Sequence, residues 1–299
     1  MDRVTRVGFI GLGIMGRSMA QNLLKNGFGL VVVGGRAADA VKVLKAQGAS
    51  VVDSPKQVAE SSDVVMTCLP DSRDVEEVYL GARGILDGVR PGMILIDTST
   101  ISPEVAIRVA IEADKRGARM LDAPVTGGQQ GAIDGTLTIM VGGDERTLEE
   151  CGAVLRSVGR KIVHVGASGA GQYTKAANQI IAAVTWQGIA EGMALACKAG
   201  VNPEKMLDVL TGGAARCYAL EVRMPRVLKG RFEPGFKATL QYKDLGIGLQ
   251  EGRRLEVPLP VTAMVHEFYK ALIRSGQGEM DTSVLVRFTE GLAGVEIRA

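Results

Sequence analysis

The stretch RVGFIGLGIMGRSMAQNLLKNG, residues 6–27, decides the fold of the first half of the chain. Residues 7–10 are apolar and predict a β-strand, whereas the apolar side chains after Gly16 recur at helical spacing. Gly11, Gly13 and Gly16 stand between these two elements in the pattern GxGxxG. A strand, a glycine turn and a helix in this order predict a dinucleotide-binding fold.

Each glycine of this pattern has a separate physical task. Gly11 permits a tight turn, Gly13 lets a pyrophosphate approach the backbone, and Gly16 lets the helix pack closely on the strand. The start of the helix adds free N–H groups and a partial positive charge. The alternative is a purely structural glycine turn. The expected cofactor contacts are Gly11, Leu12, Gly13, Ile14, Met15 and Gly16.

The second strand, residues 28–34, ends where such folds usually carry an acidic residue for the adenosine ribose. Here Gly34 is followed by Gly35 and Arg36. No carboxylate would repel a 2′-phosphate, and the Arg36 guanidinium could pair with one. We therefore expect NADP(H) to be preferred, with NAD(H) possible, and Gly35 and Arg36 to contact the cofactor. In the alternative, the glycines form only a turn and Asp39 binds the ribose.

Strand and helix patterns alternate up to about residue 166, and this alternation predicts an α/β fold with a doubly wound, largely parallel sheet. Ser102 and Pro103 predict the start of one of its helices. Ligands of such sheets bind beyond the carboxyl ends of the strands. The residues expected near the cofactor for this reason are Leu69, Pro70, Ser99, Thr100, Pro124 and Thr126.

After about residue 166 every pattern is helical. A long helical run ends near Gly200, and Asn202 with Pro203 predicts the start of the next helix. We therefore expect two domains joined by a long helix. Residues 1–165 would form a Rossmann domain that binds NADP, and residues 166–299 an all-α domain for substrate binding and oligomerisation.

Composition restricts the class of protein. The 299 residues carry 35 basic and 33 acidic side chains, and this near balance gives no reason to expect a nucleic acid or an anionic membrane as partner. The four cysteines lie far apart, so neither a disulfide framework nor a metal site is expected. No stretch approaches the roughly 18 to 20 continuous apolar residues of a membrane span. We expect a cytoplasmic protein.

A lysine with two polar neighbours interrupts the long apolar helix predicted in GAGQYTKAANQIIAA, residues 169–183. Lys175 is spaced i,i+3 from Asn178 and i,i+4 from Gln179, so the three side chains share one helix face. A lone lysine is usually a solvated surface residue. On a mostly buried helix that faces a cofactor, loss of solvation would instead lower its pKa toward acid–base chemistry.

Four blocks of the sequence, in this order, carry a resemblance to a known family. The blocks are GFIGLGIMG, DAPVTGG, GAGQYTKAANQ and YKDL, and together they cover nearly the whole chain. They resemble the β-hydroxyacid dehydrogenase family, whose members interconvert short hydroxyacids and semialdehydes with a nicotinamide cofactor. The resemblance implies a Rossmann domain, a helical C-terminal domain, and association into homodimers or homotetramers.

The resemblance also implies residue roles. Lys175 would be the catalytic acid and base, and Asn178 would orient the substrate. Thr100 would line the nicotinamide, and Lys243 would approach the cofactor or the substrate. The residues implied to bind a small carboxylated substrate are Thr126, Gly127, Gly128, Gln179 and Lys243.

Departures from the family pattern bear on the branch. Thr126 stands where the family often has serine, and Gln179 where it often has a second asparagine. The latter, with GAIDGTL, is most similar to the tartronate semialdehyde (2-hydroxy-3-oxopropionate) reductase branch. Ala182 stands where decarboxylating relatives place a glutamate. The alternatives are a 3-hydroxyisobutyrate dehydrogenase, a glyoxylate or succinic semialdehyde reductase, and a non-catalytic dinucleotide-binding scaffold. The sequence also leaves open which of Arg216, Cys217 and Tyr218 point toward the substrate.

Overall fold

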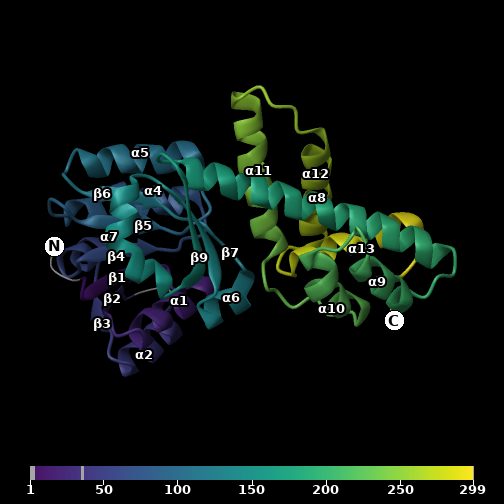
Figure 1. Ribbon diagram of the computed structural model, residues 1–299, viewed down its shortest axis with the longest axis horizontal. Coiled ribbons are helices and arrows are strands. Elements are labelled where there is room, and N and C mark those ends of the chain that lie inside the picture. The colour runs from purple at the N-terminus through teal and green to yellow at the C-terminus, as the bar shows by residue number, and fades with distance from the viewer. Residues whose placement is uncertain (1–3, 35–36, 299) are drawn as a thin grey trace. The chain divides into compact units, whose positions relative to one another are not determined.

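The protein, seen here in a computed structural model, is described over residues 4–34 and 37–298 (Figure 1). The chain divides into two compact units, Met1–Lys175 and Ala176–Ala299. The sequence predicts a division at residues 165 and 166. The first unit extends further, to Lys175, because the first turns of the long helix contact its strands.

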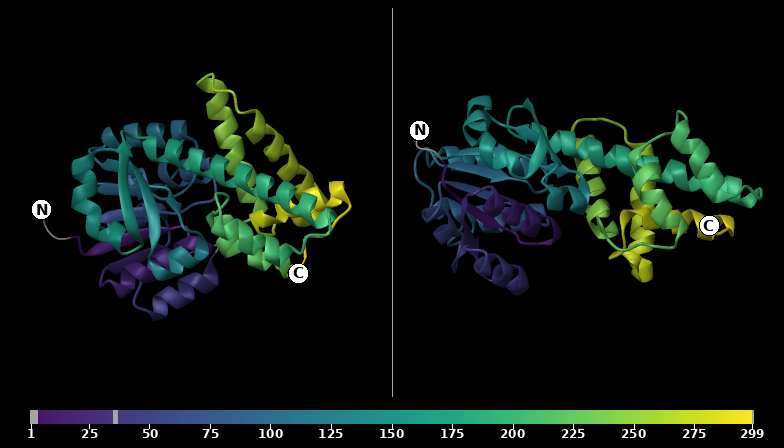
Figure 2. Two further views of the ribbon diagram at one scale, coloured as in Figure 1. Left: turned by 45° about the vertical axis from the view of Figure 1, so that its right-hand side comes forward. Right: turned by 60° about the horizontal axis from the view of Figure 1, so that its bottom comes forward.

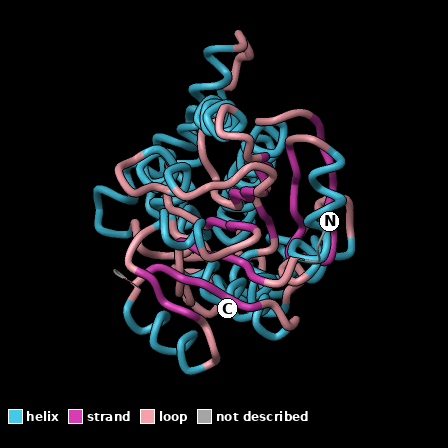
Figure 3. The backbone as a smooth tube through the Cα atoms, turned by 90° about the vertical axis from the view of Figure 1, so that its left-hand side faces the viewer, coloured by secondary structure: helices cyan, strands magenta, loops and turns pink. Residues whose placement is uncertain are grey.

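In the first unit, the described strands form one sheet in the order β3-β2-β1-β4-β5-β6-β8-β7, with β9 paired to β8. Strands β1 to β6 are parallel, as expected for a Rossmann sheet. Strand β8 runs antiparallel to β6 and β7 but parallel to β9. Figure 3 shows these strands in magenta. Their bounds are β1 (Arg6–Ile10), β2 (Gly29–Val33), β3 (Ser50–Val52), β4 (Val64–Thr67), β5 (Ile94–Asp97), β6 (Arg119–Asp122), β7 (Val125–Thr126), β8 (Leu137–Gly142) and β9 (Gly159–Gly166).

Helices cover both faces of this sheet, which confirms the doubly wound fold. Successive residues of one strand point to opposite faces, so Phe9 lies in one hydrophobic core and Ile10 in the other. The core with Phe9 contains residues of α1, α2, α6 and α7, and the core with Ile10 contains residues of α3, α4 and α5. The helical elements are α1 (Ile14–Lys25), α2 (Ala38–Ala46), α3 (Pro55–Glu60), α4 (Ser72–Leu80), η1 (Ile85–Asp87), α5 (Pro103–Asp114), α6 (Gly128–Asp134) and α7 (Glu145–Arg156).

The start of α5 departs from expectation in one detail. Ser102 and Pro103 do begin this helix, but the Ser102 side chain does not cap it. Its Oγ is buried, and among the described residues it has no hydrogen-bond partner. The Ser102 backbone N–H instead donates to Ser72 Oγ at 3.0 Å. The serine thus joins two helix starts through its backbone.

All the regular secondary structure described in the second unit is helical, apart from an isolated bridge between Lys237 and Asp281. Helices α11 and α12 lie side by side (Figure 2). The predicted cap Asn202 is confirmed, since its side chain accepts the Lys205 N–H at 3.0 Å. The elements are α8 (Ala170–Lys198, which begins in the first unit), α9 (Pro203–Gly212), η2 (Ala219–Arg223), α10 (Met224–Leu228), α11 (Ala238–Arg254), α12 (Pro260–Leu272), η3 (Ile273–Gln277), η4 (Thr282–Val284) and α13 (Leu285–Ala293).

Helix α8 corrects the expectation that no segment could span a membrane. By length and composition alone it could, because its 29 residues contain an 18-residue window with a mean hydropathy of 1.4. A core helix meets the same criteria, and Trp186, Ala190 and Met193 of α8 lie buried in the hydrophobic core of the second unit. The apolar character of α8 is therefore explained in part by internal packing.

Candidate functional site

The glycine turn between β1 and α1 has the geometry that its sequence predicts. Gly11 has a φ of +98°, and a Cβ at this position would lie 2.2 Å from the Cys68 carbonyl oxygen. A Cβ on Gly16 would lie 1.9 Å from the Gly11 carbonyl oxygen. Only glycine permits these two close approaches, and they bring the start of α1 against the end of β1.

Gly13 differs from its two neighbours in the pattern, because a Cβ there would meet nothing within 4 Å. Gly13 is the N-cap of the 12-residue helix α1, whose first N–H groups are available to an anion. Leu12 is buried in the core, so only its backbone could contact a ligand, whereas Ile14 is exposed. Open space over a helix start with free N–H groups fits the pyrophosphate of a dinucleotide.

The adenosine end of this site is only partly described. Gly35 and Arg36, the predicted partners of a 2′-phosphate, lie outside the described residues. Asp39, the alternative ribose partner, is exposed in the first turn of α2.

A buried polar network connects the carboxyl ends of β4 and β5. The Asp97 carboxylate accepts hydrogen bonds from Thr67 Oγ1 at 2.7 Å and from Ser99 Oγ at 2.5 Å. Ser99 Oγ in turn accepts the Leu69 N–H at 2.8 Å. These contacts fix two predicted positions at the strand ends, half-buried Leu69 and, directly after Ser99, half-buried Thr100. The sequence placed Ser99 at this edge but gave no sign of the carboxylate beneath it.

Thr126, Gly127 and Gly128 form the turn between β7 and α6. Gly127 has a φ of +130° and Gly128 a φ of +65°, both in the region that L-residues with side chains rarely adopt. Gly127 is exposed, and Thr126 and Gly128 are half-buried. A hydroxyl beside two backbone N–H groups without side-chain bulk suits a carboxylate.

Lys175 lies in this same unit, close to that turn. Its side chain is 6% exposed, and its Nζ donates to the Val125 carbonyl oxygen at 2.9 Å. Val125 directly precedes Thr126, so the first unit brings the ammonium group and the Thr126–Gly128 turn together. The buried lysine excludes the alternative of a solvated surface side chain.

In the second unit, Asp244 connects two predicted residues. Its carboxylate accepts from Gln179 Nε2 at 2.7 Å and forms an ion pair with Lys243 Nζ at 3.1 Å. Asn178 Nδ2 donates to Gln179 Oε1 at 2.8 Å, which extends the chain of contacts to the residue expected to orient the substrate. The Gln241 amide also contacts Gln179. Asp244 stands inside the YKDL block, but its contacts with both partners are visible only in the structure.

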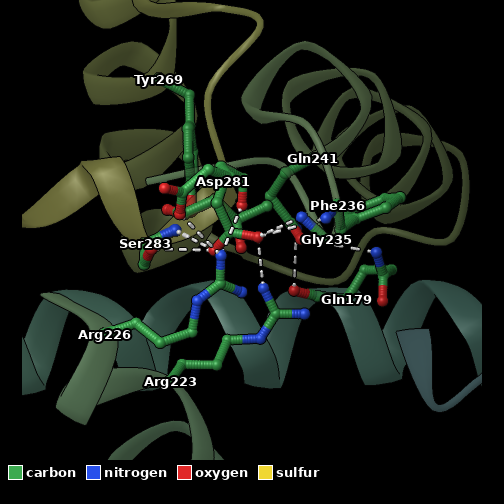
Figure 4. Close-up of polar contacts among 11 residues, drawn as sticks. Gln179, Arg223, Arg226, Gly235, Phe236, Gln241, Tyr269, Asp281 and Ser283 are labelled. Atoms are coloured by element: carbon green, nitrogen blue, oxygen red, sulfur yellow. Dashed lines mark hydrogen bonds and ion pairs between the residues drawn. The ribbon is translucent and has the colours of Figure 1, made fainter. Parts of the chain in front are cut away.

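A second buried carboxylate, Asp281, holds the loop that leads into α11 (Figure 4). It accepts the N–H groups of Gly235 at 3.0 Å and Phe236 at 3.2 Å, and it pairs with Arg223 Nη1 at 2.5 Å. Burial alone would raise the pKa of Asp281, but Arg223 and the hydrogen bonds from Ser283 outweigh it and leave that pKa below its usual value. Lys243 is on the helix that this loop begins.

Two family models match the chain. The NAD-binding domain of 6-phosphogluconate dehydrogenase matches residues 6–166, and the NAD-binding domain of NADP-dependent 3-hydroxyisobutyrate dehydrogenase matches residues 169–289. The chain belongs to the β-hydroxyacid dehydrogenase family. The family predicted from the four sequence blocks is therefore confirmed.

Its relatives carry several names. The 2-hydroxy-3-oxopropionate reductase of Escherichia coli (strain K12) is 41% identical over 289 residues, covering 96% of this chain and 98% of the relative. The 2-(hydroxymethyl)glutarate dehydrogenase of Eubacterium barkeri is 38% identical, covering 99% of each chain. The structure of Mycobacterium tuberculosis 3-hydroxyisobutyrate dehydrogenase with L-serine has a TM-score of 0.87 at 34% identity, covering 95% of this chain and 98% of that one.

A β-hydroxyacid dehydrogenase is a nicotinamide-dependent oxidoreductase, and this activity class applies to the chain. The glycine turn, the open space over Gly13 and the ordered ends of β4 and β5 fit such a cofactor. Among the described residues, no three His, Cys, Asp or Glu side chains gather to hold a metal ion.

Proposed function

We propose that this β-hydroxyacid dehydrogenase reduces tartronate semialdehyde (2-hydroxy-3-oxopropanoate) to glycerate, with Lys175 as general acid and with NADP(H) as cofactor. The observation that carries the proposal is the buried ammonium of Lys175 beside the Thr126–Gly128 turn. Reduction adds a hydride to the aldehyde carbon and a proton to its oxygen. A bound nicotinamide cofactor in its reduced form would supply the hydride.

The residues of the chain supply the rest of the chemistry. Lys175 donates the proton to the carbonyl oxygen, and in the reverse direction its neutral amine accepts the proton of the alcohol. The hydroxyl of Thr126 and the N–H groups of Gly127 and Gly128 hold the substrate carboxylate. Asn178 orients the substrate.

The hydroxyacids that correspond to the names of the relatives share one chemical skeleton, which supports a short β-hydroxyacid as substrate. Glycerate, 3-hydroxyisobutyrate and 2-(hydroxymethyl)glutarate each carry a hydroxymethyl group on the carbon beside a carboxylate, and they differ in one substituent of that carbon. L-serine, bound by the Mycobacterium tuberculosis relative, has the same skeleton. The choice of glycerate rests on Gln179 and the GAIDGTL block in the sequence, and on the relative that is 41% identical.

A substrate panel tests this choice. We expect the highest kcat/KM with tartronate semialdehyde, and lower values with succinic semialdehyde, glyoxylate and methylmalonate semialdehyde. In the oxidative direction, glycerate should exceed 3-hydroxyisobutyrate and 2-(hydroxymethyl)glutarate. A higher kcat/KM for one of the other compounds would contradict the choice of substrate but not the proposed type of reaction. Activity only on uncharged aldehydes or on imines would contradict the binding of a carboxylate.

The preference for NADP(H) rests on Arg36, because a charge-assisted hydrogen bond contributes about 1.5 to 3 kcal/mol. Arg36→Ala should raise the KM for NADPH about tenfold or more and leave that for NADH nearly unchanged. The NADP-dependent enzyme in the description of the second family model supports the same preference. If the wild-type protein preferred NADH, the result would instead favour Asp39 as the residue that binds the adenosine ribose.

We also propose a cytoplasmic homodimer or homotetramer without nucleic-acid or membrane partners. The exposed Ile181 (67%) and Leu195 (75%) on α8 support association with further copies of the chain. The net charge of +2 supports the absence of polyanionic partners. Light scattering after size-exclusion chromatography would contradict the assembly if it gave the mass of a single chain.

A further inference from the structure

The first turn of α8 is connected to the carboxyl end of β5 through one side chain, Gln172. Its carboxamide is 1% exposed. Nε2 donates to the Ser99 carbonyl oxygen at 2.8 Å, and Oε1 accepts the Ile101 N–H at 3.1 Å. These two hydrogen bonds hold the backbone on both sides of Thr100, the residue expected to line the nicotinamide.

A carboxylate from β6 holds the backbone of the same turn. Asp122 Oδ1 accepts the Gly169 N–H at 2.7 Å, and Oδ2 accepts the Gln172 N–H at 3.0 Å. An anion at this position satisfies N–H groups that have no partner within the helix, and it complements the helix dipole. The start of α8 is therefore fixed to β6 as well as to the end of β5.

Gly171 brings this turn into direct contact with the sheet. A Cβ on Gly171 would lie 2.6 Å from the carbonyl oxygens of Asp122 and Met140. The backbone of α8 thus packs against the backbone of β6 and β8 with no side chain between them. A contact of this kind leaves little freedom to slide or rotate the helix.

Lys175 is spaced i,i+3 from Gln172 and i,i+4 from Gly171, so it lies on the same side of α8 one turn later. Its Nζ reaches the Val125 carbonyl oxygen from there. Any rotation or shift of the first turn would move the ammonium away from the Thr126–Gly128 turn.

We propose that Gln172 is a positioning residue that fixes Lys175 relative to Thr100 and thereby aligns proton transfer with hydride transfer. This inference rests on the proposed role of Lys175. The two transfers end on the two atoms of one carbonyl group, about 1.2 Å apart, so both donors must be held against a common frame. The carboxamide of Gln172 is uncharged. Both of its polar atoms contact the backbone at the end of β5, and these contacts hold the start of α8 in place.

The matched pair Gln172→Met and Gln187→Met tests the proposal. Gln187 is also a buried glutamine of α8, 6% exposed, and it donates to Glu191 at 2.8 Å and to Thr289 at 3.3 Å. Each variant loses two hydrogen bonds of a buried carboxamide. Among the described residues Gln187 Oε1 has no hydrogen-bond partner, so we expect the decrease in Tm to be no larger for Gln187→Met than for Gln172→Met. Only Gln172→Met should lower kcat, by about 10- to 100-fold, because a misplacement of about 1 Å can cost that much.

Two further readouts separate positioning from general destabilisation. The dissociation constant for NADPH should change much less than kcat does in Gln172→Met, since the glycine turn is untouched. Hydrogen exchange of the Ile101 amide should accelerate in Gln172→Met alone, because its acceptor is lost. Gln172→Glu keeps that acceptor and loses the donor to Ser99, so it should also lower kcat, and it replaces Gln172→Met if the latter does not fold.

Equal kcat losses in Gln172→Met and Gln187→Met, or an unchanged kcat in a folded Gln172 variant, would overturn the positioning role. Failure of the proposed function gives a different result, because Lys175→Ala would then keep a near wild-type rate. The Ile101 exchange measurement is independent of both rates and shows whether the Gln172 contact exists in solution.

Discussion

Two helices, one that begins in each unit, start close to a buried aspartate and carry a lysine of the candidate site. Helix α8 begins beside Asp122 and carries Lys175, and the loop before α11 is held by Asp281 and leads to Lys243. Both aspartates accept backbone N–H groups. They differ in their partners, because Asp281 pairs with Arg223, whereas the Asp122 carboxylate accepts the backbone N–H groups of Gly169 and Gln172.

This difference sets the direction of the pKa shift. Burial raises the pKa of Asp122 to about 6, against the hydrogen bonds from Gly169 and Gln172 and with a further contribution from the charge of Asp97. Arg223 and Ser283 lower the pKa of Asp281 despite its burial. Backbone donors alone do not compensate the desolvation of a carboxylate here, whereas a guanidinium does.

Replacing the two lysines is expected to give the largest effects and to separate their roles. Lys175→Ala should lower kcat by about 10² to 10⁴, because general acid–base catalysis supplies about that much, while the dissociation constant for NADPH stays near wild type. Lys243→Ala should mainly raise KM, since Lys243 is expected to bind the cofactor or the substrate. Steady-state kinetics and fluorescence titration with NADPH measure both. A near wild-type kcat in Lys175→Ala would contradict its catalytic role.

Removing the charge of Asp281 is expected to have the next largest effect. Asp281→Asn leaves Arg223 without its carboxylate partner, and breaking a buried pair costs about 3 to 5 kcal/mol in the free energy of unfolding. The control is Glu233→Gln, which breaks the exposed pair with Arg226 in the same region and should cost less than about 1 kcal/mol. Chemical denaturation at pH 7 measures both, and equal losses would show that the burial of the pair is irrelevant.

Asp122→Asn is expected to change how stability depends on pH. Between pH 3.8 and about 6 the folded state binds more protons at Asp122 than the unfolded state does, so the free energy of unfolding falls as pH rises through this window. The shift from 3.8 to about 6 corresponds to about 3 kcal/mol. Asp122→Asn should remove this contribution. Asp281 has the opposite effect, because its pKa is lowered, so the stability that its carboxylate contributes is lost as pH falls. Denaturation curves at pH 4.5 and pH 7 with equal differences in wild type and variant would contradict the raised pKa.

Much of the fold could be predicted from local sequence. The glycine turn at Gly11 and the strand–helix alternation follow from periodicity and from conformations that only glycine adopts. The antiparallel placement of β8 could not be predicted, because a run such as residues 136–143 does not encode its partner strand. The criterion of a continuous apolar run did not reveal that α8 meets the length and composition criteria for a membrane span. An 18-residue window of α8 has a mean hydropathy of 1.4, although the helix contains polar residues such as Gln187.

The candidate site was predictable only where a residue type announces its chemistry. Lys175 is conspicuous because it interrupts an apolar helix, and the positive φ of Gly127 and Gly128 agrees with a run of glycines in the sequence. Asp122, Gln172 and Asp244 could not be assigned, because their roles depend on burial and on partners far away in the chain. Gln172 and the Ser99–Ile101 backbone, for example, are more than 70 residues apart.

The contact at Gly171 has a consequence for anyone who wishes to change the substrate of this enzyme. The position of Lys175 depends there on main chain against main chain, and a main chain has no alternative rotamers with which to absorb a substitution. Libraries that vary the surroundings of the Thr126–Gly128 turn can therefore explore new substrates while Lys175, the proposed proton donor, stays in place. A library that includes position 171 would displace the helix in every clone that lacks glycine, whatever the rest of its sequence offers.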